Sequence, residues 1–297
     1  MTYSIIARDA ETGEMGIACQ SQAFAVGSSV PWALPGYGVI ATQSMGEPMY
    51  GELGLDGLRA GLTASEALTA LRSVDPHPER RQVAMIDGRG VADVYTGEAC
   101  IPAAGHCIGD QCVALANMVA AEWVWQAMAA AFEATSGPLA ARLMTGLHAA
   151  EEAGGDFRGR RSAAVLVVRA HRTGRPWRDQ VVDLRVDDAE DPLAELDRLV
   201  DSNERYHQVV TAFERALDGD PEGGAALLDG LDTEDPDAEP DLLMWRGTVL
   251  ALAHREDEAA ALFASLDRVA PQFVEAARRL APSGLLPAPD LLTRVLP

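Results

Sequence analysis

Short apolar runs alternate with segments of helical periodicity as far as about residue 190. Apolar runs bounded by Gly, Asp or Asn are typical of strands. They predict strands over residues 3–8, 15–20, 38–42, 82–86, 91–95, 162–169 and 180–186, and a further apolar strand that ends at 117. Apolar residues spaced three and four apart indicate amphipathic helices. They predict helices over 49–62, 120–135 and 138–153, and another that begins at the capping box Thr63 to Glu66.

The order of these elements is strands, two helices, strands, two helices, strands. Parallel sheets require strands and helices that alternate one by one, whereas this order suits sheets with helices segregated onto their outer faces. We therefore expect an α+β fold, a four-layer α-β-β-α sandwich.

After residue 192 the strand signal ends, which predicts two domains, 1–200 and 201–297. The net charge is −10 in the first and −11 in the shorter second, so the second is more strongly charged per residue. It contains a helix within 201–235, an acidic loop with prolines over 235–240, and a helix pair over 242–253 and 257–269. The residues close to a tetratricopeptide pattern are Trp245, Gly247, Ala259, Phe263 and Pro271. Ordinary amphipathic packing helices are the alternative.

Composition excludes several classes of function. The chain is 48% apolar, enough for a core, and has neither a membrane-length apolar run nor a basic, apolar secretory leader, so we expect a cytoplasmic protein. Its net charge is −21 and it contains no lysine, which disfavours nucleic acid and anionic membranes as partners. No common nucleotide-binding or zinc-protease motif is present, and we predict no cofactor.

Metal binding is disfavoured as well. A cluster of potential ligands is formed by Cys100, His106, Cys107 and Cys112, but it contains no pair of cysteines at the spacing usual for zinc. We predict buried or unreactive thiols, an exposed His106 and no metal.

Thr2 is the strongest candidate for chemistry. It follows Met1, which cells commonly remove when the next side chain is small. Removal would place a hydroxyl and an α-amine on one residue, and the amine, with an ordinary pKa of about 8, can accept the hydroxyl proton near neutral pH. A threonine with its own terminal amine is a known pair of nucleophile and base.

Residues well beyond Thr2 strengthen this interpretation. The informative segments are residues 2–9, 16–21, 25–27, 30–32, 38–43, 116–118, 154–164 and 182–188, of which 154–164 is the most specific. Across residues 2 to about 200 the chain resembles the bacterial family called domain of unknown function 1028. That family resembles the N-terminal nucleophile hydrolases, so the resemblance implies a four-layer sandwich and amide hydrolysis.

The resemblance also implies roles for single residues. Thr2 matches the nucleophile, and Ser162 resembles the serine that helps to hold the terminal amine in proteasome-type relatives. Two departures stand out, because those relatives have an Asp where this chain has Gln20, and a catalytic Lys where no lysine exists. Either Asp156 with Arg158 or Arg160 replaces this polar support, or Asp156 and Arg158 clamp a loop.

Three further positions complete the candidate site. Asn117 either donates its amide to an oxyanion or caps a helix that begins near 119. Gln43 and Ser44 either line a substrate pocket or end a strand, and Trp32 is a third candidate for substrate binding.

Two functions remain open at this stage. The first is hydrolysis of a small amide or peptide-like substrate by Thr2. The second is a catalytically silent binding or scaffold protein whose C-terminal helices dock a partner protein. Proteins of the implied fold often assemble, so we also expect a homo-oligomer.

Overall fold

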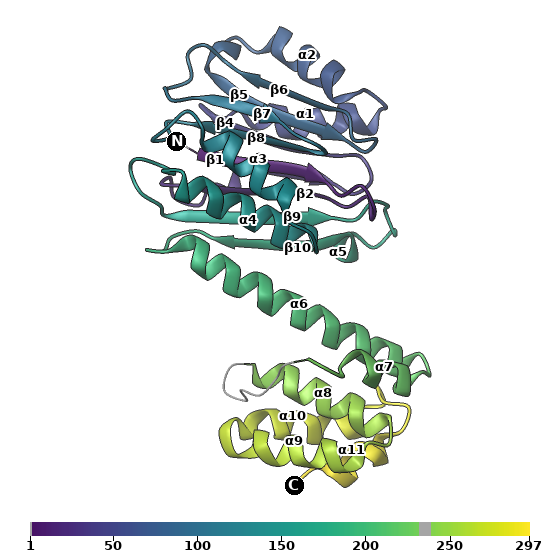
Figure 1. Ribbon diagram of the computed structural model, residues 1–297. Helices are drawn as coiled ribbons and strands as arrows, with labels where there is room; N and C mark the ends of the chain where they lie inside the picture. The colour runs from purple at the N-terminus through teal and green to yellow at the C-terminus, as the bar shows by residue number, and fades with distance from the viewer. Residues whose placement is uncertain (1, 232–238) are drawn as a thin grey trace. The chain divides into compact units, whose positions relative to one another are not determined.

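The computed structural model describes residues 2–231 and 239–297. Contacts divide the chain into two compact units, Met1–Val200 and Asp201–Pro297. The first unit contains two antiparallel sheets with helices, and in the described part of the second unit every regular element is a helix. The chain is therefore an α+β protein with a helical C-terminal region (Figure 1). Residues 235–238 of the predicted acidic loop lie outside the described residues.

A six-stranded sheet has the order β10-β9-β2-β1-β8-β7. Its strands are β1 (Thr2–Arg8), β2 (Met15–Ser21), β7 (Gly105–Ile108), β8 (Cys112–Asn117), β9 (Ser162–Val168) and β10 (Gln180–Val186). The turn between β1 and β2 is set by Asp9, whose carboxylate accepts hydrogen bonds from the backbone N–H groups of Glu11 and Thr12. The central strands are buried over almost their whole length.

A four-stranded sheet has the order β3-β4-β5-β6. Its strands are β3 (Pro31–Leu34), β4 (Gly38–Ser44), β5 (Arg81–Asp87) and β6 (Ala92–Thr96). An apolar cluster that includes Ile6, Ile17, Val39, Ile86 and Leu115 joins the inner faces of the two sheets. Because side chains alternate between the faces of a strand, every second residue of β1, β2, β4, β5 and β8 points into this space.

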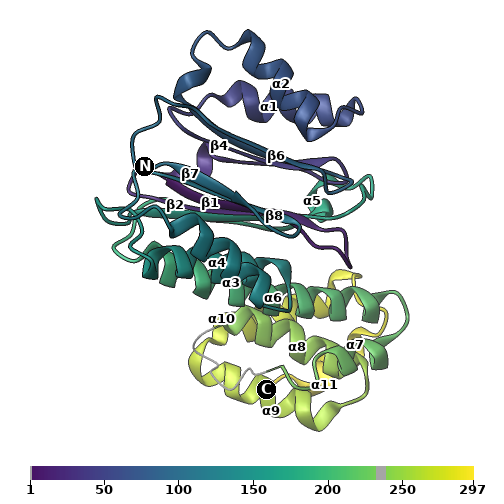
Figure 2. The same ribbon diagram turned by 45° about the horizontal axis from the view of Figure 1, so that its top comes forward.

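Helices cover the outer faces of both sheets (Figure 2). α3 (Val124–Ala134) and α4 (Leu139–Glu152) pack on the six-stranded sheet, and α1 (Pro48–Arg59) and α2 (Ala64–Val74) pack on the four-stranded sheet. The predicted capping box is confirmed, because Thr63 and Glu66 each accept a hydrogen bond from the other's backbone N–H. Short elements complete the unit: η1 (Val26–Ser28), η2 (Pro78–Arg80) and α5 (Pro176–Asp179).

Several predicted boundaries need correction. α3 begins at Val124 and not at 120. Residues 120–123 form part of a loop instead, in which the Ala120 N–H donates to the Gly155 carbonyl oxygen. β3 and β7, four residues each, were not predicted because they are too short to show a clear period. α6 (Pro192–Leu217) begins before 201 and contains the boundary between the units.

The second unit has its own apolar core. Its other elements are α7 (Pro221–Leu227), α8 (Pro240–Leu252), α9 (Glu256–Val269), α10 (Pro271–Leu280), η3 (Ala281–Ser283) and α11 (Pro289–Val295). α8 and α9 contain the predicted helix pair. Gly247 of α8 lies against the Phe263 ring of α9, and an added Cβ would be 2.8 Å from Phe263 Cε2.

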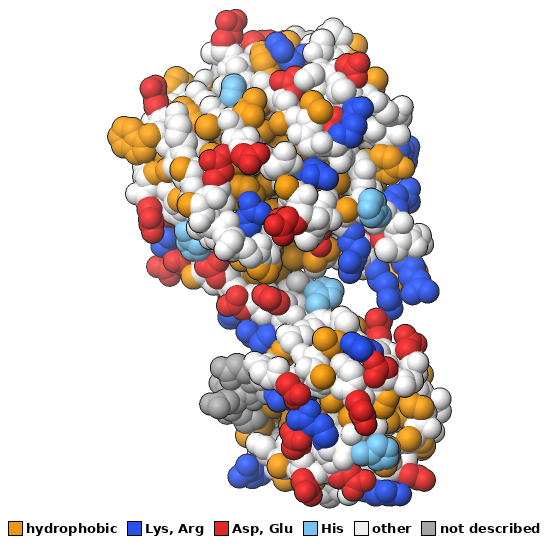
Figure 3. All heavy atoms as spheres, turned by 45° about the vertical axis from the view of Figure 1, so that its right-hand side comes forward, with side chains coloured by type: hydrophobic (Ala, Val, Ile, Leu, Met, Phe, Trp, Pro, Cys, Tyr) orange, Lys and Arg blue, Asp and Glu red, His pale blue; other side chains and the backbone are white. Residues whose placement is uncertain are grey.

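Charged side chains are spread over the surface. In the view of Figure 3, red acidic and blue arginine side chains are interspersed on both units. Within the described residues, no helix is both long enough and apolar enough to cross a bilayer.

Candidate active site

Polar side chains form a row across four neighbouring strands of the six-stranded sheet, at the end where β1 begins. The row consists of Ser162, Ser21, Thr2 and Asn117, from β9, β2, β1 and β8. Ser21 pairs with Ser162 and Thr2 pairs with Asn117 in the strand register. All four are buried, and Thr2 is 7% exposed.

A second polar row lies opposite, on the inner face of the four-stranded sheet. Gln43 of β4 pairs with Gln82 of β5, which pairs in turn with Thr96 of β6. The glutamines are almost fully buried. The strand residues that precede and follow each glutamine point toward the helices, so the glutamines point toward the six-stranded sheet.

Hydrogen bonds connect the rows around the backbone of Thr2. Gln43 Nε2 donates to the Thr2 carbonyl oxygen at 3.1 Å and to Gln82 Oε1 at 2.8 Å. Asn117 Nδ2 donates to the same two oxygens, at 3.4 Å and 2.9 Å. Both amide groups thus hold the carbonyl of Thr2 from different sheets.

Gln82 is the centre of this network. Its Oε1 accepts from both amides, and its Nε2 lies 3.0 Å from Thr96 Oγ1 and 2.9 Å from the Ala116 carbonyl oxygen. Ser4, two residues beyond Thr2 on the same face of β1, donates to Gln43 Oε1 at 2.6 Å. Because each buried amide is hydrogen-bonded, the network avoids the cost of unsatisfied polar groups, about 1–3 kcal/mol each.

The Thr2 hydroxyl donates to Ser21 Oγ at 3.3 Å. Ser21 Oγ also accepts from the Ala23 backbone N–H at 2.9 Å, which fixes the hydroxyl at the start of the following loop. The Thr2 side chain is therefore oriented by Ser21, while its carbonyl is held by Gln43 and Asn117.

Asn117 does not cap a helix. The alternative of a cap is wrong, because α3 begins only at Val124 and Trp123 occupies its N-cap position. Both Nδ2 hydrogens of Asn117 are directed at Thr2 and Gln82 instead.

Gln20 lies on the other face of the sheet from Thr2. Its register partner is Tyr3, which packs under the helices, and Ser21 is the residue of β2 on the Thr2 side. Gln20 is fully buried, and neither of its amide atoms has a hydrogen-bond partner among the described residues. Tyr3 itself donates to Glu151 Oε2 at 2.7 Å, and burial, together with this carboxylate, raises its pKa well above the ordinary value.

Ser162, Asp156 and Arg158 hold loops at the same end of the sheet. Ser162 Oγ donates to the Ala23 carbonyl oxygen at 2.6 Å and accepts from the Val26 backbone N–H at 3.0 Å. The buried Asp156 carboxylate accepts from the Gln22 N–H at 3.0 Å and pairs with the Arg158 guanidinium. These contacts fix the loop after β2 against the loop before β9.

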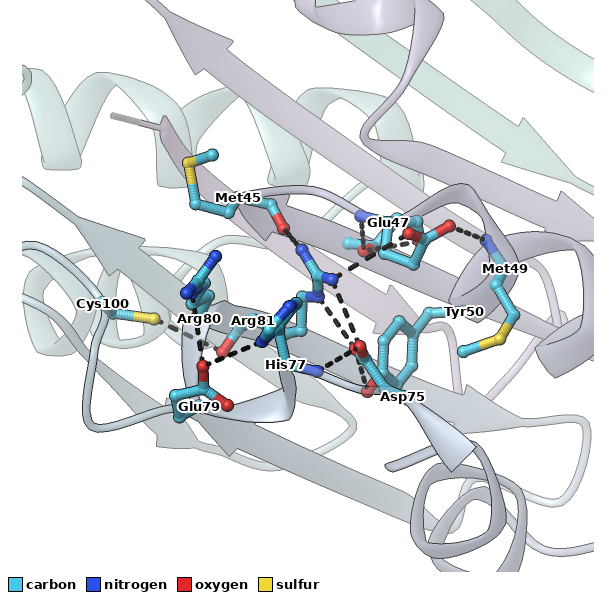
Figure 4. Close-up of polar contacts among 11 residues, drawn as sticks. Met45, Glu47, Met49, Tyr50, Asp75, His77, Glu79, Arg80, Arg81 and Cys100 are labelled. Atoms are coloured by element: carbon cyan, nitrogen blue, oxygen red, sulfur yellow. Dashed lines mark hydrogen bonds and ion pairs between the residues drawn. The ribbon is translucent and has the colours of Figure 1, made fainter. Parts of the chain in front are cut away.

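Ser44 ends β4 in a left-handed conformation, with φ of 69°. Arg81 stabilises the turn after Ser44, because its guanidinium donates to the Met45 carbonyl oxygen at 2.6 Å and to the buried Asp75 carboxylate (Figure 4). Hydrogen bonds from Arg81 lower the pKa of Asp75 to about 2. Tyr50 also donates to this carboxylate, at 3.0 Å.

Trp32 is not brought to the other candidates. Its register partner is Ile40, which faces helix α1, and its ring lies against Gly51 of that helix. Its Nε1–H donates to the Ser29 carbonyl oxygen at 2.9 Å. Trp32 therefore packs the outer face of the four-stranded sheet.

The cysteines and His106 form no cluster of ligands. Among the described residues, no group of three or more His, Cys, Asp or Glu side chains is arranged to hold a metal ion. All four cysteines are free, and burial raises the pKa of the Cys19 and Cys112 thiols to about 12. His106 is exposed and its Nδ1 lies 2.9 Å from Thr96 Oγ1.

Sequence reasoning missed Ser21, Gln82, Thr96 and Ser4. Their signal was present, since each interrupts the apolar positions of a strand on its inner face. The alternation alone does not say which strands will face each other, so the meeting of the two rows was not predictable.

Comparison with known proteins gives the family. The model of a family of unknown function, DUF1028, matches residues 2–196. A crystal structure of protein SPO2555 from Silicibacter pomeroyi, also a DUF1028 protein, is similar at 32% sequence identity and a TM-score of 0.61, over 68% of this chain and 88% of that one. No curated protein matches. This chain belongs to the DUF1028 family.

Proposed function

We propose that the first unit is an amide hydrolase whose nucleophile is Thr2, made N-terminal by removal of Met1. The observation that carries the proposal is that Thr2 belongs to one buried polar row and is hydrogen-bonded to the second row, through Gln43. The space between sheets is otherwise apolar, and buried polar groups are costly unless they are hydrogen-bonded. A network that converges on one residue at the end of the core favours a functional role over simple packing.

The reaction follows from the two groups of Thr2. The hydroxyl proton passes to the terminal amine as Oγ attacks the amide carbonyl carbon. The C–N bond then breaks, the amine returns the proton to the leaving nitrogen, and the acyl group remains on Oγ as an ester. Water, deprotonated by the same amine, hydrolyses the ester and restores Thr2.

Neutral groups surround the proposed nucleophile. Ser21 orients the hydroxyl, and Gln43 and Asn117 are positioning residues that hold the Thr2 carbonyl. Because both Asn117 hydrogens are already bonded, we do not assign it to an oxyanion. Since the chain has no lysine, the terminal amine is the base, with an ordinary pKa of about 8. Turnover should therefore rise with pH as this amine loses its proton.

We also propose that the two facing sheets with their outer helices are the four-layer sandwich of the N-terminal nucleophile hydrolases. Supporting this are the apolar cluster between the sheets, the helices on each outer face, and the start of β1 at the polar row.

Intact mass and turnover together test the proposal. Mass spectrometry measures whether Met1 is lost, and release of amine from small acyl amides measures turnover. Thr2→Ala should lose turnover by about 10³-fold or more, whereas Thr2→Ser keeps both reacting groups and should retain part of it. An uncleaved N-terminal extension should be as damaging as Thr2→Ala, since it converts the amine to an amide without basicity. A folded, extended protein that hydrolyses amides as fast as the processed one would refute the proposal.

We propose that the helical unit is tetratricopeptide-like and contributes no catalytic group. The close packing of Gly247 on Phe263 supports the first part, and the location of both polar rows within residues 2–162 supports the second. A chain that ends after Val200 retains Leu193 and Leu196, which pack in the first unit. We expect it to keep the turnover of the full chain, and lost turnover in a folded truncation would contradict this.

A further inference from the structure

Six loops meet at the end of the two sheets where β1 begins. They follow β2, β4, β6 and β8 and precede β5 and β9, and so surround the strand ends that carry the two polar rows. In Figure 2 this is the end marked N.

Hydrogen bonds connect each of these loops to the next one in space. The Gln22 N–H bonds to Asp156, and the Ala120 N–H bonds to the Gly155 carbonyl oxygen at 3.0 Å. The Met118 N–H donates to the Ile101 carbonyl oxygen at 3.1 Å. The Ala99 N–H donates to the Glu79 carbonyl oxygen at 2.8 Å, and the Met45 N–H donates to the Arg80 carbonyl oxygen at 3.3 Å. The six loops are thus linked into one continuous series at the end of the sheets where Thr2 lies.

Each of five loops in this series exposes one large apolar side chain. The exposed fractions are 50–62%, and the residues, here called the apolar rim, are Phe24, Met45, Ile101, Trp123 and Phe157. Among the described residues of the first unit, four Phe or Trp side chains are exposed, and three of them belong to the rim. The fourth, Trp177, lies in α5 beside the far end of β9, the opposite end of the sheet.

The arginines of these loops are paired with carboxylates. Arg158 pairs with Asp156, and further guanidinium–carboxylate pairs are Arg80–Glu79, Arg81–Asp75, Arg160–Asp191 and Arg161–Asp188. The Arg161 guanidinium also lies over the Phe24 ring, at 5.3 Å. Arginines already bonded to carboxylates are poor receptors for an anionic substrate, whereas exposed aromatic rings favour apolar ones.

We infer that the apolar rim selects the substrate, and that the amide cleaved at Thr2 is uncharged and carries a long alkyl or aromatic acyl group. This inference rests on the proposed function, since it takes Thr2 as the point where the scissile amide binds. The rim residues act as specificity determinants and not as catalytic residues.

Binding to the full-length Thr2→Ala protein tests the inference without turnover. The probes are acetyl, butyryl, octanoyl and succinyl amides of 7-amino-4-methylcoumarin, with affinity measured by fluorescence anisotropy. Each methylene that is buried contributes about 0.8 kcal/mol, so even partial burial of the longer chain should make octanoyl bind about 10-fold tighter than acetyl. The succinyl amide, which is negatively charged, should bind no tighter than acetyl.

Added substitutions of Phe24, Trp123 or Phe157 by Ser should each reduce the gain from chain length about 3-fold. The matched control, Trp177→Ser, removes an aromatic that is even more exposed, at the other end of the sheet, and should leave the gain unchanged. Equal affinity across the acyl series, or an equal loss with Trp177→Ser, would overturn the inference. So would rim variants that change the sedimentation mass but not the acyl preference, because the rim would then be a contact between copies.

Turnover of the processed wild-type protein separates the two proposals. If octanoyl amides bind through the rim but are never hydrolysed, the proposed function fails and the inferred preference stands. If acetyl and octanoyl amides are hydrolysed with equal kcat/KM, the hydrolase proposal stands and the rim does not select substrate.

Discussion

Substitution by methionine should change the stability of the fold in opposite directions at two buried glutamines, Gln82 and Gln20. Gln82 is bonded through both amide atoms, to Gln43, Asn117, Thr96 and backbone carbonyls, whereas Gln20 has no partner among the described residues. Methionine has nearly the length and flexibility of glutamine but has no amide. Gln→Met at each position therefore changes the hydrogen bonding and little else.

The expected magnitudes follow from what each change leaves unpaired. Gln82→Met removes the acceptor of two buried amide donors, Gln43 Nε2 and Asn117 Nδ2, and the donor to the Ala116 carbonyl oxygen. An unsatisfied buried group costs about 1–3 kcal/mol, and some of the released groups will find new partners, so we expect a loss of about 3 kcal/mol. Gln20→Met instead removes two unsatisfied polar atoms from the core and should stabilise by about 1 kcal/mol.

Hydrogen exchange measured by mass spectrometry is the suitable assay, because it reports on the first unit separately from the helical unit. Peptides from β1 and β8 should exchange about 100-fold faster in Gln82→Met, since 1.4 kcal/mol corresponds to a factor of ten. In Gln20→Met the same peptides should exchange more slowly. Changes of the same sign and size in both variants would refute the reasoning, and destabilisation by Gln20→Met would show that its amide holds an ordered water.

The remaining predictions concern the outer face of the four-stranded sheet. Because hydrogen bonds from Arg81 lower the pKa of Asp75 from 3.8 to about 2, this carboxylate should stabilise the fold by about 2 kcal/mol above pH 4 and lose that contribution as the pH falls toward 2. Urea unfolding of Asp75→Asn should show a deficit at pH 7 that shrinks at pH 2.5, and a deficit independent of pH would contradict this. An added Cβ at Gly51 would lie 2.1 Å from Trp32 Cδ2, so Gly51→Ala should lower Tm and cost about 1–3 kcal/mol. Gly57→Ala on the same helix, where the nearest atom is 3.3 Å away, is the matched control and should raise Tm or leave it unchanged.

Much of the fold was predictable because its signals are local. The hairpin at Asp9, the capping box at Thr63 and the apolar runs of β1, β2 and β9 depend on neighbouring residues alone. The short edge strands were not predictable, and neither was the start of α3, where the chain at Ala120 bonds to a loop distant in sequence. Tertiary contacts decide such boundaries.

The candidate site, like the fold, was predictable from the sequence only in part. Thr2 was found from its place in the sequence and Asn117 from its position at the end of an apolar strand. The hydrogen bonds of Thr2 with Gln43 and of Asn117 with Gln82 depend on the pairing of β4 with β5 and on the packing of two sheets, which sequence patterns do not encode. Ser21 was missed although the strand period could have distinguished it from Gln20, since only every second residue of β2 can share a face with Thr2.

Backbone strain gives an independent reason to regard this end of the sheets as functional. Five residues other than glycine have positive φ among the described residues. Three of them lie at this end: Ser44 is the last residue of β4, and Ala25 and Met118 lie in the loops that follow β2 and β8. Such conformations cost about 1–3 kcal/mol each and persist only where surrounding contacts impose them. Here the contacts include those that link the loops to one another, such as the Met118 N–H bond to the carbonyl oxygen of Ile101. Strain, buried polar groups and exposed apolar side chains each reduce stability or solubility, and their concentration around Thr2 supports the proposal that this end of the sheets is a functional site.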